Sequence, residues 1–295
     1  MPSSAAVEVA VSLLDKGTEL GRVARLSGRW CGSVYPTAGE GTVAWKALSR
    51  GGEPLSEAER VSVASLGRAV VETDNERAVR RARGAVRRYL AHNGLTEMVT
   101  LTFAGVPPHV ADLSGCVKAF RRRVLRSSGV DLAPYVWVPE WGKETGRLHV
   151  HLATRAFSAG AFVEVCEVCA VERLRLVRSD LPPAGSRCFG CLWGWGFVGR
   201  PERARRDGSG GLSSYLSKYL AKDLGGYLPA GSQRYRVAQG FAVPRLRVEA
   251  DSLVGAVACV VDGFWGTVVC SGEPPIIDAP FSAPSGPVVR VRSVV

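Results

Sequence analysis

Two histidines separated by one residue form the first candidate metal-binding feature of the sequence. His149 and His151 lie in a run over 147–154 whose alternating pattern predicts a β-strand. Side chains at i and i+2 of a strand share a face, so both imidazoles project together. Such a pair commonly binds a divalent metal but needs a third ligand. An ordinary solvent-facing histidine pair is the alternative.

A carboxylate near these histidines is the candidate third ligand. Glu140 ends a predicted strand over 135–140, and a glycine-containing turn over 143–146 predicts a hairpin that folds Glu140 back beside His149 and His151. Two imidazoles and one carboxylate leave coordination positions open for water or a phosphate oxygen. Glu144, in the turn, is the reserve ligand, and a surface salt bridge is the alternative for either carboxylate.

A tyrosine and lysine repeat is the second chemical feature. In a helix predicted over 213–224, Tyr215 and Tyr219 recur at i, i+4, and so do Lys218 and Lys222. Leucines at every fourth position give the same helix a buried stripe. A plain amphipathic helix with packed tyrosines and solvated lysines would have the same pattern, so the repeat gains meaning only beside a metal site.

Two matched CxxC pairs form the third feature. Cys166 and Cys169 are followed, after eighteen intervening residues, by Cys188 and Cys191. This spacing predicts a four-cysteine zinc ribbon, in which four thiolates surround one structural Zn²⁺ and stabilise an insertion over 160–193. Four reduced cysteines without metal, or a redox pair, are the alternatives.

Composition limits the partners. The net charge is +11 with a pI near 9.6, and arginine far outnumbers lysine. This balance favours a polyanion, nucleic acid above all, because the guanidinium binds phosphate through two hydrogen bonds. An anionic membrane would predict a basic amphipathic stripe or a lipidation signal, and neither is found. No secretory signal is visible, so we expect a cytoplasmic protein whose cysteines do not form a disulfide framework.

The order of the predicted elements indicates an α+β domain with a central antiparallel sheet flanked by helices. The elements are a helix over 73–90, a strand over 97–103, a helix over 109–126, strands over 135–140, 147–154 and 194–199, and the helix over 213–224. Residues 32–52 predict a loop with short strands around it. The apolar run 253–270 predicts core strands or a helix rather than a membrane span. The division is an N-terminal extension of unknown role (1–72), a central domain (73–250) and a C-terminal segment and tail (251–295).

Three blocks in this order resemble the HUH endonuclease superfamily, specifically the rolling-circle replication initiators of plasmids and phages in their two-tyrosine form. The blocks are TLTF over 100–103, EWGKETGRLHVH over 140–151 and YLSKYLAK over 215–222. HxH or YxxxY alone is a weak signal, whereas the ordered combination is specific. The resemblance covers roughly residues 73–250, including a basic stretch, Arg234-Tyr-Arg236, after the tyrosine helix.

The resemblance implies an RRM-like core and a nicking reaction on single-stranded origin DNA. Mg²⁺ or Mn²⁺ would be held by His149, His151 and Glu140. Tyr215 or Tyr219 would attack, giving a 5′-phosphotyrosine and a 3′-hydroxyl that a polymerase extends. Lys218 and Lys222 would help position the phosphate. No GxxxxGK[ST] loop is present, so unwinding is expected to depend on a host helicase.

Other functions share parts of this pattern. A transposase of the same superfamily would use the same chemistry for strand transfer into a new target. A conjugative relaxase fits less well, since those enzymes usually carry three clustered histidines. A non-enzymatic zinc-ribbon DNA-binding regulator fits the charge and the cysteines but leaves the histidine pair and the paired tyrosines unexplained. Metal-dependent nicking separates this last class from the others.

Overall fold

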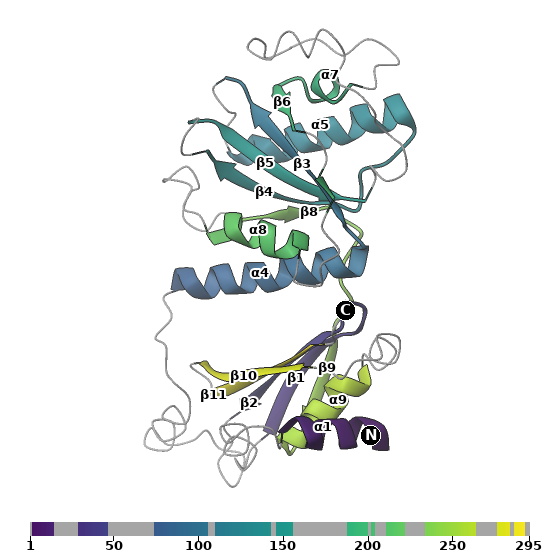
Figure 1. The fold of residues 1–295 in the computed structure, drawn as a ribbon, viewed down its shortest axis with the longest axis vertical. Coiled ribbons are helices and arrows are strands. Elements are labelled where there is room, and N and C mark those ends of the chain that lie inside the picture. Colours follow the sequence, from purple (N-terminus) through teal and green to yellow (C-terminus); the bar gives the residue numbers. More distant parts are fainter. Residues whose placement is uncertain are drawn as a thin grey trace. The chain divides into compact units, whose positions relative to one another are not determined.

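The chain folds into two compact units, one of residues 74–242 and one that joins residues 1–73 to residues 243–295. Figure 1 shows both units in the computed structural model. The structure describes residues 2–14, 29–46, 74–105, 110–142, 146–155, 188–199, 202–203, 211–221, 234–263, 276–283 and 286–292.

The unit of residues 74–242 is built on an antiparallel sheet in the order β6-β3-β5-β4-β8. Its three longer strands are β3 (Glu97–Phe103), β4 (Val136–Trp141) and β5 (Leu148–Thr154). The short strands β6 (Gly196–Val198) and β8 (Arg236–Val237) form its borders, and β7 (Glu202–Arg203) also pairs with β3. Strand β3 has the bounds that the sequence predicts, and β4 and β5 differ from their predicted bounds by one residue.

Helices lie on both faces of this sheet (Figure 1). On one face, α5 (Val110–Ser128) packs Val117 and Phe120 against Leu148, Val150 and Leu152 of β5. These alternating β5 residues point into the core, as the strand period requires. On the other face lie α4 (Asp74–Asn93) and α8 (Gly211–Ala221), which contact each other and β4. The expected α+β class is confirmed, with an antiparallel sheet flanked by helices.

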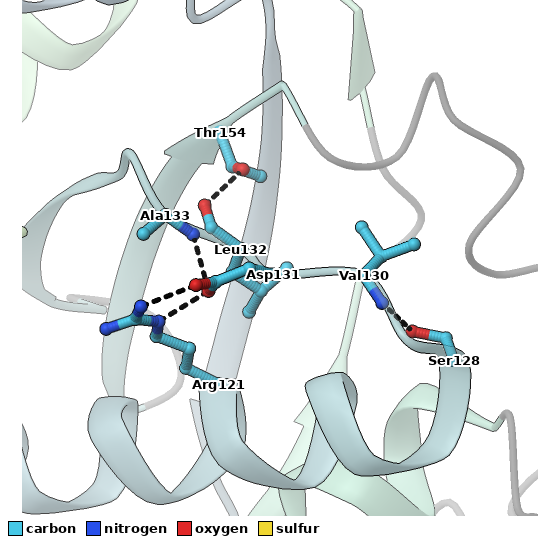
Figure 2. A network of polar contacts seen from close by, with 7 residues as sticks. All are labelled: Arg121, Ser128, Val130, Asp131, Leu132, Ala133 and Thr154. Carbon is cyan, nitrogen blue, oxygen red and sulfur yellow. Dashed lines mark hydrogen bonds and ion pairs between the residues drawn. The ribbon is translucent and has the colours of Figure 1, made fainter.

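A polar network fixes the connection from α5 to β4 (Figure 2). Arg121 donates through two nitrogens to the Asp131 carboxylate, which also accepts a hydrogen bond from the Ala133 backbone N–H. Ser128 donates to the Val124 carbonyl and accepts from the Val130 N–H, closing the helix end. The hydrogen bond from Arg121 holds the pKa of Asp131 below its usual value.

We expect Asp131→Asn to destabilise the protein by about 1 kcal/mol, because one charge-assisted pair is lost at a site that is partly screened by solvent. The lowered pKa of Asp131 means that this stabilisation is present above the unfolded-state pKa and is lost as the pH falls through the folded-state value. Urea unfolding at neutral and acidic pH measures it. The difference between wild type and Asp131→Asn should shrink in acid, and a constant difference would contradict the assignment.

The second unit carries a five-stranded antiparallel sheet in the order β10-β11-β2-β1-β9. The strands are β1 (Arg29–Tyr35), β2 (Glu40–Lys46), β9 (Leu246–Ala250), β10 (Ile276–Ala283) and β11 (Gly286–Arg292), and a 3-10 turn, η1 (Pro36–Ala38), joins the first two. The helices α1 (Ser4–Leu14) and α9 (Leu253–Gly263) contact each other, and α9 packs on the sheet. Residues from both ends of the chain therefore share one core.

The loop predicted over 32–52 is wrong for its first part, because residues up to Lys46 form the β1–β2 hairpin. Gly39 ends the turn between the two strands with a φ of 58°, whereas Gly32 and Gly41 serve close packing within the strands. A Cβ on Gly41 would lie 2.2 Å from Val260 Cγ1 of α9, so a larger residue would push the helix off the sheet. Residues 246–250, which the sequence placed with the central domain, are β9 and pair with β1 instead.

The apolar run that begins at Leu253 forms α9, which ends at Gly263 and buries Leu253, Val257 and Val260 among other residues. Burial in a core, as the sequence predicts, is confirmed for this part of the run. In the described parts of the chain, no helix combines the length and apolar character needed to cross a membrane.

Candidate active site

The β4–β5 hairpin brings the predicted carboxylate to the predicted histidines. Glu140 is the cross-strand partner of His149, and Val138 is the partner of His151. Glu140, His149 and His151 therefore share the sheet face opposite the α5 core. His151 Nε2 lies 2.6 Å from Glu140 Oε2, and both side chains are buried, with 4% and 8% of the residue exposed.

Two threonines of β3 hold the imidazoles from the neighbouring strand. Thr100 is paired with His151 and Thr102 with His149. Thr100 Oγ1 lies 3.1 Å from His151 Nδ1, and Thr102 Oγ1 lies 2.8 Å from His149 Nδ1. Each ring is thus fixed through Nδ1. A hydroxyl both donates and accepts, so either histidine tautomer can keep this hydrogen bond.

The sequence missed the role of these threonines, although it placed them in the first motif. Their signal was present: Thr100 and Thr102 are spaced i, i+2, like the histidines, and so share one face of their strand. What the sequence lacked was the pairing of β3 with β5.

Helix α8 places both tyrosines over the histidine face. The Tyr219 ring is stacked on His151, with ring centroids 3.9 Å apart and planes 16° from parallel. Tyr215 lies edge-on to the same imidazole at 6.2 Å and packs against Tyr219 at 5.0 Å. Lys218 is exposed, with its Nζ 5.8 Å from the Tyr215 ring centre. Lys222 lies outside the described residues, as does Glu144.

Contacts with arginines and a leucine stripe fix α8 in this position. Leu216 and Leu220 are almost fully buried, as the predicted stripe requires. Arg83 of α4 donates to the Ser217 carbonyl at 3.3 Å, and Arg234 donates to the Leu220 carbonyl at 3.2 Å. The second contact puts a cation near the carbonyls at the helix C-terminus, where the helix dipole favours positive charge.

The donor chemistry of this face suits a divalent metal, but the side chains are not arranged around one. No group of three or more His, Cys, Asp or Glu side chains within the described ranges has a metal-holding arrangement. His151 and Glu140 touch directly, whereas two ligands of one metal with bonds of about 2.1 Å lie roughly 3 Å apart. The two side chains would have to move slightly apart to bind one metal. The threonine hydrogen bonds already orient both rings, as hydrogen bonds to the second ring nitrogen do for metal-bound histidines.

Two of the four predicted zinc ligands are described. Cys188 precedes α7 (Phe189–Trp193) and Cys191 lies within it, both buried. Arg123 donates to the carbonyls of Leu192 and Trp193, and the Trp193 indole donates to the Thr102 carbonyl. This CxxC pair is therefore anchored to the core beside β3. Cys166 and Cys169 lie outside the described residues.

Residues 96–224 match the family model described as Replication-associated protein ORF2/G2P. The match supports a replication initiator protein. It covers fewer than half of the 295 residues, beginning one residue before β3 and extending past α8. The matched span thus contains the threonine, histidine and tyrosine elements of the site, while α4 and the other unit lie outside it. No curated protein and no solved structure shows significant similarity to the chain.

Proposed function

We propose that the protein initiates rolling-circle replication by nicking and rejoining single-stranded origin DNA through a 5′-phosphotyrosine. One observation carries the proposal: Tyr219 is stacked on His151, which is hydrogen-bonded to Glu140, inside the span that matches the replication-associated family. A nucleophile, imidazoles and a carboxylate meet on one face of a rigid sheet. Such a set is the minimum for metal-assisted phosphoryl transfer.

His149, His151 and Glu140 are the proposed ligands of Mg²⁺ or Mn²⁺. When bound, the metal would polarise the scissile phosphate and stabilise the charge that builds on its oxygens. With the metal bound, Thr100 and Thr102 would accept a hydrogen bond from the Nδ1–H of each imidazole, which would leave the Nε2 lone pair for the metal. Because the imidazole rings are already oriented, they would have to move less when the metal binds.

The tyrosine supplies the covalent step. Its Oη forms a bond to phosphorus as the bond from phosphorus to the 3′ oxygen breaks; the phenol loses its proton and the leaving oxygen gains one. The products are a 5′-phosphotyrosine and a 3′-hydroxyl. Attack by a 3′-hydroxyl on the phosphotyrosine reverses these changes and rejoins the strand without ATP. Since Tyr215 and Tyr219 both contact His151, they can alternate, with the exposed Lys218 near the phosphate.

Covalent attachment tests the proposal. The protein is mixed with labelled single-stranded DNA, including the origin strand of its replicon, with Mn²⁺ or with chelator, and resolved on a denaturing gel. A chelator-sensitive protein–DNA band supports nicking. A separate helicase is expected to unwind the duplex and a polymerase to extend the 3′-hydroxyl, so ATP-driven strand displacement by this protein alone would contradict that part.

The four cysteines of the two CxxC pairs are the proposed ligands of a structural Zn²⁺. We expect the purified protein to contain stoichiometric zinc by atomic absorption. Cys188→Ser combined with Cys191→Ser should remove the zinc and lower the thermal midpoint, because a structural zinc contributes folding free energy directly. The matched control is Cys116→Ser, a buried cysteine of α5 outside the pairs, which should retain zinc. A zinc-free wild-type protein would refute the site.

A further inference from the structure

A cavity of about 400 Å³ lies between α5 and the β4–β8 border of the sheet. This volume falls within the range of about 300–1,000 Å³ that is usual for ligand sites. Tyr135 and Trp137 are among its lining residues, and both are almost fully buried. Neighbouring residues of a strand point to opposite faces of the sheet, and Trp137 of β4 is the neighbour of Val138, the cross-strand partner of His151. The cavity therefore lies on the sheet face opposite the histidines and tyrosines.

Basic side chains surround this cavity. Lys118, Arg121, Arg122 and Arg236 line it, and the described lining includes no carboxylate. Arg121 is paired with the Asp131 carboxylate. The other three basic side chains are exposed, and Asp131 does not neutralise them. Lys118 and Arg122 are spaced i, i+4 along one side of α5, and Arg236 faces them from β8. The ligand chemistry that this arrangement fits is a row of phosphate groups.

A glycine opens the helix side of the cavity. Gly115 lies within α5 and lines the cavity, and a Cβ at this position would have no atom within 4 Å. A glycine inside a helix costs about 1 kcal/mol relative to alanine. Local packing does not require it, but its absent side chain lets a ligand approach the helix backbone about one turn before Lys118, on the side of α5 that also carries Arg122.

We propose that this cavity binds the sugar-phosphate backbone of the DNA strand away from the phosphate that is cut. The inference rests on the proposed function for the identity of the strand. Since the aromatic rings are buried, they form a floor rather than stacking surfaces, and binding depends on phosphate rather than on bases. Two separated contacts on one unit would hold the origin strand while its cut end is attached or released.

The test is fluorescence anisotropy of a labelled mixed-sequence single strand with chelator present, so that no cleavage occurs. The variant combines Lys118→Gln, Arg122→Gln and Arg236→Gln. We expect its Kd to rise about tenfold and the slope of log K against log salt to fall by about 2, since each lost phosphate contact removes roughly 0.7. The control, Arg81→Gln with Arg126→Gln and Arg155→Gln, removes the same charge from exposed positions outside the cavity.

A second variant separates a built site from diffuse charge. Gly115→Leu fills the cavity without changing charge and replaces glycine by a better helix former, so the fold should be retained. It should weaken binding severalfold. Equal losses in the charge variant and its control, or unchanged binding by Gly115→Leu, would overturn the proposal. Displacement of the strand by thymidine monophosphate at equal phosphate concentration would also overturn it, by reassigning the cavity to a free nucleotide.

The covalent gel assay distinguishes failure of this proposal from failure of nicking. If wild type forms the adduct while the charge variant binds the strand normally, only the cavity proposal falls. If wild type forms no adduct on its own origin strand but the charge variant still loses binding, the proposed nicking function is refuted. The cavity is then still supported as a nucleic-acid binding site.

Discussion

The double variant Tyr215→Phe, Tyr219→Phe will form no covalent adduct with single-stranded origin DNA, a loss of at least about a thousandfold relative to wild type. Phenylalanine keeps both rings against His151 and so preserves the packing of α8, while it removes the two phenol oxygens that are proposed to attack. A denaturing gel in Mn²⁺ measures the adduct. Tyr235→Phe is the control, because Tyr235 belongs to the same unit but not to α8.

The single variants should differ. The Tyr219 ring centre lies 3.9 Å from that of His151, against 6.2 Å for Tyr215, so Tyr219→Phe is expected to reduce the first cleavage more strongly. Tyr215→Phe should mainly reduce a second cleavage after Tyr219 has become attached. An adduct that persists in the double variant would show that the nucleophile is assigned wrongly. Tight binding with no wild-type adduct on the true origin strand would favour a non-enzymatic zinc-ribbon binding protein.

Local periodicity was enough to predict where the site residues lie within their elements. Alternation along β5 put His149 and His151 on one face, and a short turn returned Glu140 to them. Repetition at i, i+4 likewise placed Tyr215 and Tyr219 on one side of α8. These predictions needed only neighbours in sequence, because strand and helix periods are local properties.

Long-range pairing decided the rest. The threonines of β3 meet the histidines only because β3, some fifty residues earlier, lies next to β5. Similarly, part of the segment that was predicted to be a loop forms the strands β1 and β2. These strands are stabilised by pairing with β9 and β11, which come from the far end of the chain: β9 pairs with β1 and β11 with β2. Glycine composition favoured a loop there, yet Gly41 is required by the approach of α9. Tertiary context thus overrides a local signal where two distant segments share one core.

Replacing Glu140 by glutamine should separate a metal site from a merely structural pair. Glutamine can still accept a hydrogen bond from His151 Nε2, so the fold without metal should change little, whereas the negative charge needed for Mn²⁺ is lost. We expect nicking to fall at least about a hundredfold. Mn²⁺ should raise the thermal midpoint of wild type by several degrees, since ligand at about 100 times Kd adds about 2.7 kcal/mol, and should leave Glu140→Gln unchanged.

Asp131→Asn is the matched control for this experiment. It removes one carboxylate of the same unit that is bonded to Arg121 on the α5 side, so it should lower the midpoint but keep the Mn²⁺ shift and the nicking rate. Because Glu140 is hydrogen-bonded directly to His151, its role could also be purely structural, and the experiment can show this. If Glu140→Gln keeps both the Mn²⁺ shift and the rate, Glu140 serves only to hold His151, and the metal, if one is used, must take its carboxylate from elsewhere in the chain.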